Sequence, residues 1–297
     1  MFGKRLLSGM VLVIILALLL IPGGDILLGA SFVLSLIAYR ELMKACKLSG
    51  YLKKEGPFFE GQKNLIGCFS GIELLGYLGI AVYYCILRFC NDSIYCLLTV
   101  FGILVAFMFV YVFTFPKYEA KDIMRAFFCL VYGPLMLTFI YSTREYPEGI
   151  YFVWMIFICS WISDTMAYCV GMLFGKHRLA PVLSPKKSIE GAIGGVVGAG
   201  LVGFLYAYFW VTPHLVATYG FSNMVTVRIV IICLIGAVVT QVGDLAASGI
   251  KRNEGIKDYG KLIPGHGGIM DRFDSVIFAA PMIYLLTLIF IEIESKL

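Results

Sequence analysis

The sequence predicts an all-α, polytopic membrane protein with about nine transmembrane helices and a cytoplasmic N-terminus. The 297-residue chain is 60% hydrophobic and only 14% charged, whereas soluble domains carry about 25% charged residues. Apolar runs long enough to cross a bilayer recur along the whole chain. Basic residues are dense in alternate connections between these runs, as expected when the connections lie on alternate sides of a membrane.

The predicted spans follow one another with mostly short connections. The first, residues 6–22, has the basic start of a signal peptide but no small-residue cleavage site, so we interpret it as a retained anchor. The run at 26–39 is short and could either cross the membrane or form a re-entrant piece. Further spans are expected near residues 65–90, 93–115, 123–142, 150–172, 189–211, 227–247 and 275–293.

The charge distribution assigns the two sides of the membrane. With the N-terminus inside, 20 of the 24 Lys and Arg residues fall on the inner side, which the positive-inside rule makes cytoplasmic. The net charge of +5 is then explained by topology and requires no nucleic acid as a partner. We expect cytoplasmic loops at 40–63, 173–188 and 249–272. We assign residues 1–150 to N-terminal transmembrane helices and residues 151–297 to a C-terminal catalytic region.

The cysteines and histidines do not indicate a disulfide framework or a zinc site. None of the nine cysteines forms a C-x-x-C pair, and most lie in apolar runs, where cysteine packs as a small hydrophobic residue. Only three histidines are present.

Polar side chains interrupt the apolar pattern in three places. Ser160, Asp164 and Tyr168 recur every four residues and share a helix face. A charged side chain within a span costs roughly 2.5–3.5 kcal/mol, so Asp164 is expected to face a polar cavity or a partner. An interhelical hydrogen bond or a buried ion pair is the purely structural alternative.

The other two places lie at the inner ends of the last two spans. Gln241, Asp244 and Ser248 share a helix face, and Asp271 and Asp274 open the final span. Aspartates in a first helical turn can simply complement the helix dipole. Carboxylates from neighbouring helix ends that face water also suit a hard cation such as Mg²⁺.

Basic residues surround these carboxylates. Lys186 and Lys187 precede a helix that is predicted to begin near Ser188. Bases, helix starts and a divalent ion are the groups that hold polyphosphate. The glycines of PGHGG could approach such a ligand closely or only allow a turn, and their position between basic and acidic residues favours ligand contact. The long inner loop adds Lys251, Arg252, Lys257, His266 and Arg272.

Two other glycine-containing stretches are excluded as phosphate loops. GMLFGKH is one residue short of a P-loop, and no Ser or Thr follows its lysine. GAIGGVVGAG, residues 191–200, lies in an apolar span, where glycines four residues apart allow helices to pack closely.

Residues 248–274 resemble the signature of the phosphatidate cytidylyltransferase (CDP-diacylglycerol synthase) family. The order is Ser-x-apolar-Lys-Arg, four residues, Lys-Asp, then Pro-x-His-Gly-Gly and Asp-Arg-x-Asp, and every fixed position is present. A second similar block contains Asp164-Thr165, Ala167-Tyr168, Gly175-Lys176 and Ser184-Pro185-Lys186-Lys187. Ser188 stands where threonine is more common. The resemblance covers roughly residues 154–275.

The resemblance implies a magnesium-dependent nucleotidyltransferase of phospholipid synthesis. Such an enzyme makes CDP-diacylglycerol and pyrophosphate from CTP and phosphatidic acid, surrounded by membrane lipids. It implies a bacterial inner (plasma) membrane location with the active site facing the cytoplasm, and it suggests a homodimer. The phosphate of phosphatidic acid can itself attack CTP, so no nucleophilic side chain is required.

Together, the pattern and the resemblance nominate site residues. Asp244 and Asp271 are expected to anchor Mg²⁺, with Asp164 and Asp274 as further ligands or close neighbours, and a second cation can be accommodated. The catalytic candidates are Asp244, Asp271, Lys251, Arg252, His266 and Arg272. His266 could contact phosphate or assist proton transfer. The substrate-binding candidates are Ser184, Lys186, Lys187, Glu190, Ser248, Lys257, Asp258, Gly267 and Gly268.

Two alternatives remain. A related CTP-dependent enzyme, acting on another lipid phosphate or as a lipid kinase, would need the same inner loops. An ion-coupled transporter would also explain membrane aspartates. A transporter should carry polar residues toward both faces, however, whereas here they crowd one face and the outer segment 212–226 is nearly uncharged.

Overall fold

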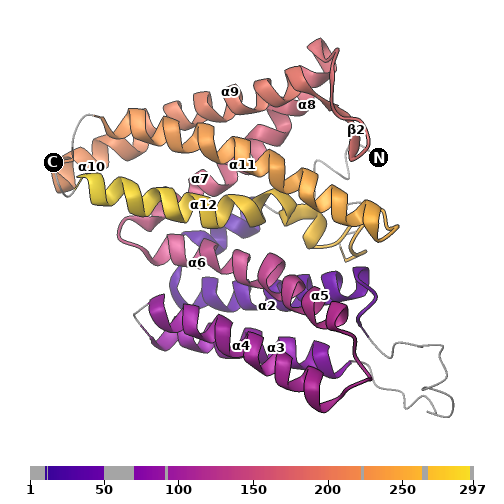
Figure 1. Ribbon diagram of the computed structural model, residues 1–297. Coiled ribbons are helices and arrows are strands. Elements are labelled where there is room, and N and C mark those ends of the chain that lie inside the picture. Colours follow the sequence, from indigo (N-terminus) through magenta and orange to yellow (C-terminus); the bar gives the residue numbers. More distant parts are fainter. Residues whose placement is uncertain are drawn as a thin grey trace. The chain divides into compact units, whose positions relative to one another are not determined.

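The computed structural model describes residues 11, 13–49, 70–90, 93–221, 224–262 and 267–294. Most of these residues are helical (Figure 1). The chain divides into two compact units, which are described separately. Unit 1 comprises Met1–Leu27, Met136–Gly255 and Arg272–Leu297, and unit 2 comprises Leu28–Leu135 and Ile256–Asp271. The expected division of roles between residues 1–150 and 151–297 stays a prediction.

Unit 2 is built from the first described helices of the chain. Helix α2 enters it at Leu28, and the segment 256–271 joins it from the C-terminal half. Its elements are α2 (Gly24–Ala45), α3 (Gly71–Phe89), α4 (Ser93–Phe113), α5 (Ala120–Leu130) and the π-helical turn η1 (Val131–Leu135).

Unit 1 contains the remaining helices and a two-stranded antiparallel hairpin. Its elements in chain order are α6 (Met136–Glu145), α7 (Gly149–Phe157), the π-helical turn η2 (Ile158–Ile162), α8 (Ser163–Phe174), β1 (Arg178–Ala180), β2 (Ser184–Ser188), α9 (Ile189–Tyr206), the π-helical turn η3 (Ala207–Val211), α10 (Thr212–Tyr219), α11 (Val225–Asn253) and α12 (Met270–Glu294), which joins this unit from Arg272 onward.

The predicted all-α membrane architecture is confirmed. Eight helical stretches within the described residues are long and apolar enough to cross a membrane. The short run predicted at 26–39 belongs to α2, whose 22 residues reach the length of a full span. Of the first predicted span, residues 13–20 are helical. The total of nine spans and the cytoplasmic N-terminus stay predictions.

Several helices extend beyond the apolar runs that predicted them. The loop expected at 40–63 begins inside α2, and the loop expected at 249–272 loses its first residues to α11, so Lys251 and Arg252 are helical. The outer segment 212–226 contains α10. Hydropathy marks only the part of a helix that lies in hydrocarbon, whereas backbone hydrogen bonds continue the helix into its polar ends.

Helices α8 and α9 pack against each other in antiparallel fashion through glycines. A methyl group added at Gly191 would collide with the backbone carbonyl of Ala167, and one added at Gly195 would collide with that of Ser163. The predicted packing role of this glycine-rich span is therefore confirmed, because any larger residue would force the two backbones apart.

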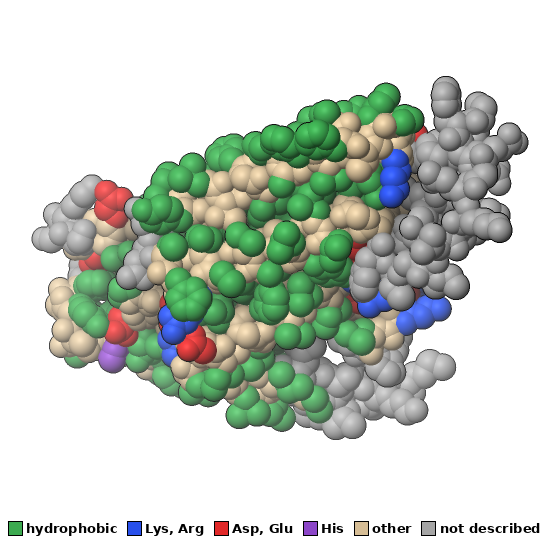
Figure 2. All heavy atoms as spheres, turned by 90° about the horizontal axis from the view of Figure 1, so that it is seen from below, with side chains coloured by type: hydrophobic (Ala, Val, Ile, Leu, Met, Phe, Trp, Pro, Cys, Tyr) green, Lys and Arg blue, Asp and Glu red, His purple; other side chains and the backbone are tan. Residues whose placement is uncertain are grey.

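Helix α4 has the least buried surface among the candidate spans. Only 11% of the residues in its most apolar stretch are buried, and the side chain of Phe113 is 79% exposed. Hydrophobic side chains also cover most of the visible described surface in Figure 2. Apolar surface of this extent requires lipid rather than water as its solvent.

Candidate functional site

A cavity of about 530 Å³ lies within unit 1, at the end of the helices that carries the β1–β2 hairpin. Its volume is in the range of small-molecule sites. Helix α8 contributes Asp164 and Tyr168, and α11 contributes Gln241 and Asp244. The remaining lining residues come from α8, the hairpin and α9, and they are Ala167, Gly171, Met172, Leu179, Ser184, Lys186, Lys187, Ser188, Gly191 and Ala192. The cavity thus joins two of the three polar places that the sequence singled out, those at Asp164 and at Asp244.

The hairpin delivers two lysines to this cavity and is fixed at its base. Helix α9 begins where it was predicted to begin, and Ser188 is its N-cap: its hydroxyl accepts the N–H of Gly191 at 3.1 Å. The Glu190 carboxylate accepts the backbone N–H groups of Lys176 (3.1 Å) and His177 (3.2 Å) and contacts the His177 ring nitrogen Nδ1 at 2.6 Å. These contacts give Glu190 a structural role that its nomination as a substrate-binding residue did not anticipate.

Lys187 forms an ion pair with Asp244 across the cavity. The lysine comes from β2 and the aspartate from the C-terminal third of α11, so the pair joins two elements that are far apart in sequence. Their side chains are 27% and 22% exposed, which leaves both groups accessible from the cavity. The sequence offered an ion pair only as the structural alternative for Asp164, whereas the pair observed involves Asp244, and both of its partners line the cavity.

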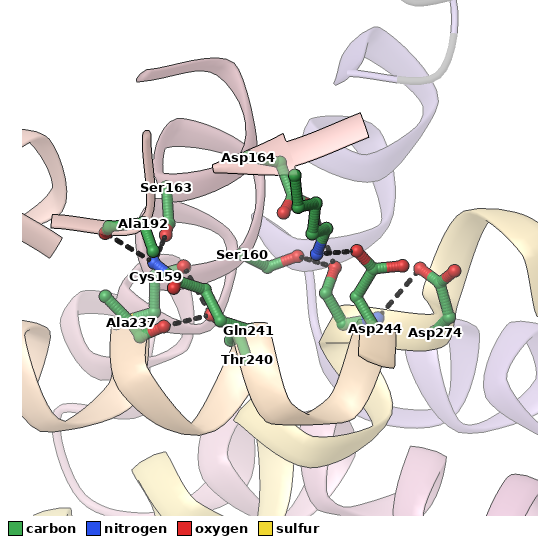
Figure 3. A network of polar contacts seen from close by, with 12 residues as sticks. Cys159, Ser160, Ser163, Asp164, Ala192, Ala237, Thr240, Gln241, Asp244 and Asp274 are labelled. Carbon is green, nitrogen blue, oxygen red and sulfur yellow. Dashed lines mark hydrogen bonds and ion pairs between the residues drawn. The ribbon is translucent and has the colours of Figure 1, made fainter. Parts of the chain in front are cut away.

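A chain of hydroxyl groups supports Asp164 (Figure 3). Ser275 donates to Asp164 Oδ2 at 3.3 Å, and its Oγ lies 2.7 Å from that of Ser160. Both serines are buried, and the π-helical turn η2 that holds Ser160 directly precedes Asp164. Single π-helical turns of this kind are frequent at functional sites. The predicted polar face of this helix thus continues as a hydrogen-bonded network.

Three carboxylates of unit 1 influence one another. Asp164 and Asp274 each interact electrostatically with Asp244, and Figure 3 shows all three beside the hydroxyl network. Lys251 is near enough to interact with Asp274, and Arg272 with Asp164. The structure therefore brings together most of the acidic and basic residues that were predicted for this side.

The donor set of this cluster fits Mg²⁺. Carboxylate oxygens are the protein ligands that the ion prefers, and it is usually held by one or two of them together with water and substrate phosphates. In the described part of the chain, no group of three His, Cys, Asp or Glu side chains is arranged to hold a metal ion. Magnesium binding at this cluster stays a prediction.

Asp271 lies in unit 2 and organises the loop before α12. Its Oδ2 accepts the N–H of Tyr259 at 2.8 Å and that of Gly268 at 3.0 Å. Gly267 has φ +84°, a backbone conformation that residues other than glycine rarely adopt. The turn that the sequence offered as the alternative for these glycines is thus visible at Gly267, while ligand binding by Asp271, Gly267 and Gly268 stays a prediction.

The other nominated residues are more exposed or outside the described ranges. Lys257 and Asp258 are exposed in unit 2, and Arg252 is exposed at the end of α11. Ser248 is half-buried on α11 and does not line the cavity. His266 falls outside the described residues, so its predicted role is untested.

Sequence reasoning missed Glu41 of α2. Its side chain is buried, and its two oxygens accept the N–H groups of Ile269 (3.1 Å) and Met270 (2.9 Å). The available signal was weak: Glu41 is the one acidic residue between positions 26 and 49, and it stands at the end of an apolar run. Its partners are more than 220 residues away in the chain.

Comparison with known proteins covers nearly the whole chain. Residues 3–290 match the cytidylyltransferase family. Proteins named phosphatidate cytidylyltransferase from Staphylococcus saprophyticus, Staphylococcus epidermidis and Staphylococcus aureus are each 32% identical to this chain. Each alignment covers 95% of this chain and 97% of the relative. The similarity thus includes the first 150 residues, where the sequence alone indicated only apolar spans.

Proposed function

Since the chain belongs to the cytidylyltransferase family, we propose that it transfers the cytidylyl group of CTP to phosphatidate at the cavity of unit 1. The observation that carries this assignment is the ion pair of Lys187 and Asp244 at a cavity that also contains Asp164. A site for a nucleoside triphosphate requires a lysine that binds phosphate and carboxylates that bind a divalent ion. Their position in a membrane protein gives a lipid substrate access to them.

The reaction needs no covalent enzyme intermediate. A phosphate oxygen of phosphatidate attacks the α-phosphorus of CTP, and a new phosphorus–oxygen bond forms. The bond from the α-phosphorus to the oxygen that bridges it to the β-phosphorus breaks, so pyrophosphate leaves with that oxygen and CDP-diacylglycerol remains in the membrane. The enzyme contributes by holding both phosphates in line and by stabilising charge on the leaving group.

The basic side chains of the hairpin hold the triphosphate. Lys187 is oriented at the cavity by Asp244, and the neighbouring Lys186 is exposed at its edge. Lys251 and Arg272, which interact with the carboxylates of the cluster, share the remaining phosphate charge. Tyr168 and Met172 are exposed and line the same cavity, so they offer apolar surface to the glycerol or acyl part of the lipid.

Magnesium, when bound with CTP, supplies positive charge at the phosphates and so favours departure of pyrophosphate. Asp244 would hold it, with Asp164 and Asp274 as neighbouring donors. Asp271 was expected to share this task, and its hydrogen bonds to Tyr259 and Gly268 show that it also maintains the loop before α12.

The protein is an integral membrane protein, and we place its active site on the cytoplasmic side of a bacterial inner membrane. CTP is made in the cytoplasm, and the basic residues of the hairpin satisfy the positive-inside rule on that side. The relatives that this chain resembles come from bacteria.

A direct assay tests the proposal. Purified protein in detergent, supplied with CTP, phosphatidate and Mg²⁺, should release pyrophosphate and form CDP-diacylglycerol, whereas ATP in place of CTP should not support turnover. Release of CDP together with a newly phosphorylated lipid would identify a lipid kinase instead. No reaction with phosphatidate but turnover with another lipid phosphate would identify a different acceptor.

A further inference from the structure

Two carboxylates in unit 2 organise the segment that carries the second half of the family signature. We call residues 256–271 the signature segment, of which 256–262 and 267–271 are described. Asp271, at its end, accepts N–H groups from Tyr259 and Gly268 and so ties the two described parts together. Glu41 reaches the same segment from α2, outside both motif blocks.

The Glu41 carboxylate lies against the segment on two sides. Its oxygens accept the N–H groups of Ile269 and Met270, which open α12 and have no partner within that helix. Gly260 and Gly268 both face the carboxylate, and a methyl group added at either position would collide with it. Glycine at these two positions is therefore explained by the need to admit Glu41.

We propose that Glu41 is a positioning residue for the reaction, which fixes the backbone of the two described parts of the signature segment and thereby places Lys257, Asp258, Gly267 and Asp271. This inference rests on the proposed function for the roles of those residues. A residue that only stabilised the start of α12 would need its two hydrogen bonds and nothing more. Gly260 and Gly268 also lie against the same carboxylate, so Glu41 contacts the segment at two further points besides the start of α12.

The test compares Glu41→Gln with Glu73→Gln. Glu73 is the matched control because it is also buried in unit 2 at the start of a helix, and its carboxylate accepts from the Ser49 hydroxyl. Both changes replace a buried carboxylate by an amide of nearly the same size. Only Glu41→Gln places an amide N–H opposite backbone N–H groups of the signature segment, where it repels one of them.

The first measurement needs no activity. Lys261→Cys is introduced into each protein, and the rate at which a water-soluble maleimide modifies position 261 is followed by mass spectrometry of its peptide. Lys261 is exposed and belongs to the segment. Glu41→Gln should raise the rate at least fivefold, while Glu73→Gln should leave it within twofold of the parent protein.

The second measurement is turnover per folded protein. Glu41→Gln should lower kcat/KM for CTP at least tenfold, and Glu73→Gln should leave it within threefold even where its thermal stability falls equally. If Glu41→Gln yields little folded protein, Gly260→Ala tests the same contact from the side of the segment. In the double variant, kcat/KM for CTP should fall by less than the product of the two separate reductions.

Equal labelling rates in the Glu41 and Glu73 variants, with kcat/KM for CTP reduced in neither or in both alike, would overturn the proposal and leave Glu41 as a helix-start contact. A parent protein that does not transfer the cytidylyl group would instead contradict the proposed function. The labelling comparison would still decide whether Glu41 orders the segment, so the two failures are distinguishable.

Discussion

Lys187 on the hairpin and Asp244 on α11 are held together as an ion pair at the cavity, although 57 positions separate them in the sequence. The pair is about three-quarters buried, so neither charge can be removed without affecting the other. It also holds each group where its chemistry is required. Asp244 keeps the lysine at the cavity where we propose that phosphate binds, and Lys187 keeps the carboxylate near Asp164.

Asp244→Asn should reduce turnover at least 100-fold while the protein still folds and inserts. The change is nearly isosteric and removes the charge that would hold magnesium, so the loss should appear in kcat at limiting Mg²⁺ before it appears in thermal stability. Asp25→Asn is the matched control, because Asp25 is exposed in the first turn of α2 and lies outside both motif blocks. Near-normal turnover of Asp244→Asn would mean that the carboxylate is only a structural partner of Lys187.

The double variant Lys187→Met/Asp244→Asn separates structure from catalysis. Either single change leaves an uncompensated polar group in a partly buried place, at a cost of about 1–3 kcal/mol, whereas removing both should restore most of the unfolding temperature. Activity should not return, because both the phosphate and the cation lose their ligands. Recovery of turnover together with stability in the double variant would show that the pair serves the fold alone.

Gly191→Ala should destabilise the protein because its new methyl group meets the Ala167 carbonyl on α8. Overpacking of this kind costs about 1–3 kcal/mol and should lower Tm in detergent by several degrees. Gly102→Ala in α4 is the control: nothing lies within 4 Å of its added methyl group. Alanine favours helix more than glycine does, so this variant should be unchanged or slightly more stable. Equal Tm values for both variants would contradict close α8–α9 packing.

Removal of divalent cations with EDTA should abolish pyrophosphate release, and added Mg²⁺ should restore it. The expectation follows from three carboxylates that interact with one another, two of which line a cavity that also contains lysines. Without a cation they would repel a triphosphate. Asp164→Asn should raise the Mg²⁺ concentration needed for half-maximal rate, and full activity in EDTA would show that the carboxylates serve another purpose.

Position 261 should face the cytoplasm. Lys261→Cys in intact cells should resist a membrane-impermeant maleimide and react only after the cells are opened, because 20 of the 24 basic residues fall on the assigned inner side. A cysteine placed at exposed Tyr219 serves as the control for the opposite side and should react in intact cells. The reverse pattern would invert the topology.

The membrane architecture and one half of the site could be predicted from the sequence. Apolar runs report directly on burial in lipid, and the four-residue spacing of Ser160, Asp164 and Tyr168 reports directly on a helix face. Predictions of this kind succeed because the signal is local. The start of α9 at Ser188 was found for the same reason, since a capping side chain sits next to the turn that it caps.

The remaining features depend on contacts between distant parts of the chain. Strands β1 and β2 have three and five residues, too few for an alternating pattern, and they exist because they pair with each other. In the sequence, Glu41 looks like an ordinary charge at the end of a span. Its role becomes visible only in the fold, where the N–H groups of Ile269 and Met270 donate to it. Glu190 was nominated for a substrate, but its spacing from Lys176 could not show that it holds that backbone.

The bracing of the hairpin by Ser188 and Glu190 has a consequence for how substrate is captured. The contacts that order the hairpin lie entirely within the protein, including a further bond of 2.9 Å from the Ile189 N–H to the His177 carbonyl. Because the strand is already ordered, its lysines lose little backbone conformational entropy when they bind phosphate. Capture of the nucleotide should then be governed by electrostatic steering rather than by closure of a lid, so its association rate should fall steeply as ionic strength rises.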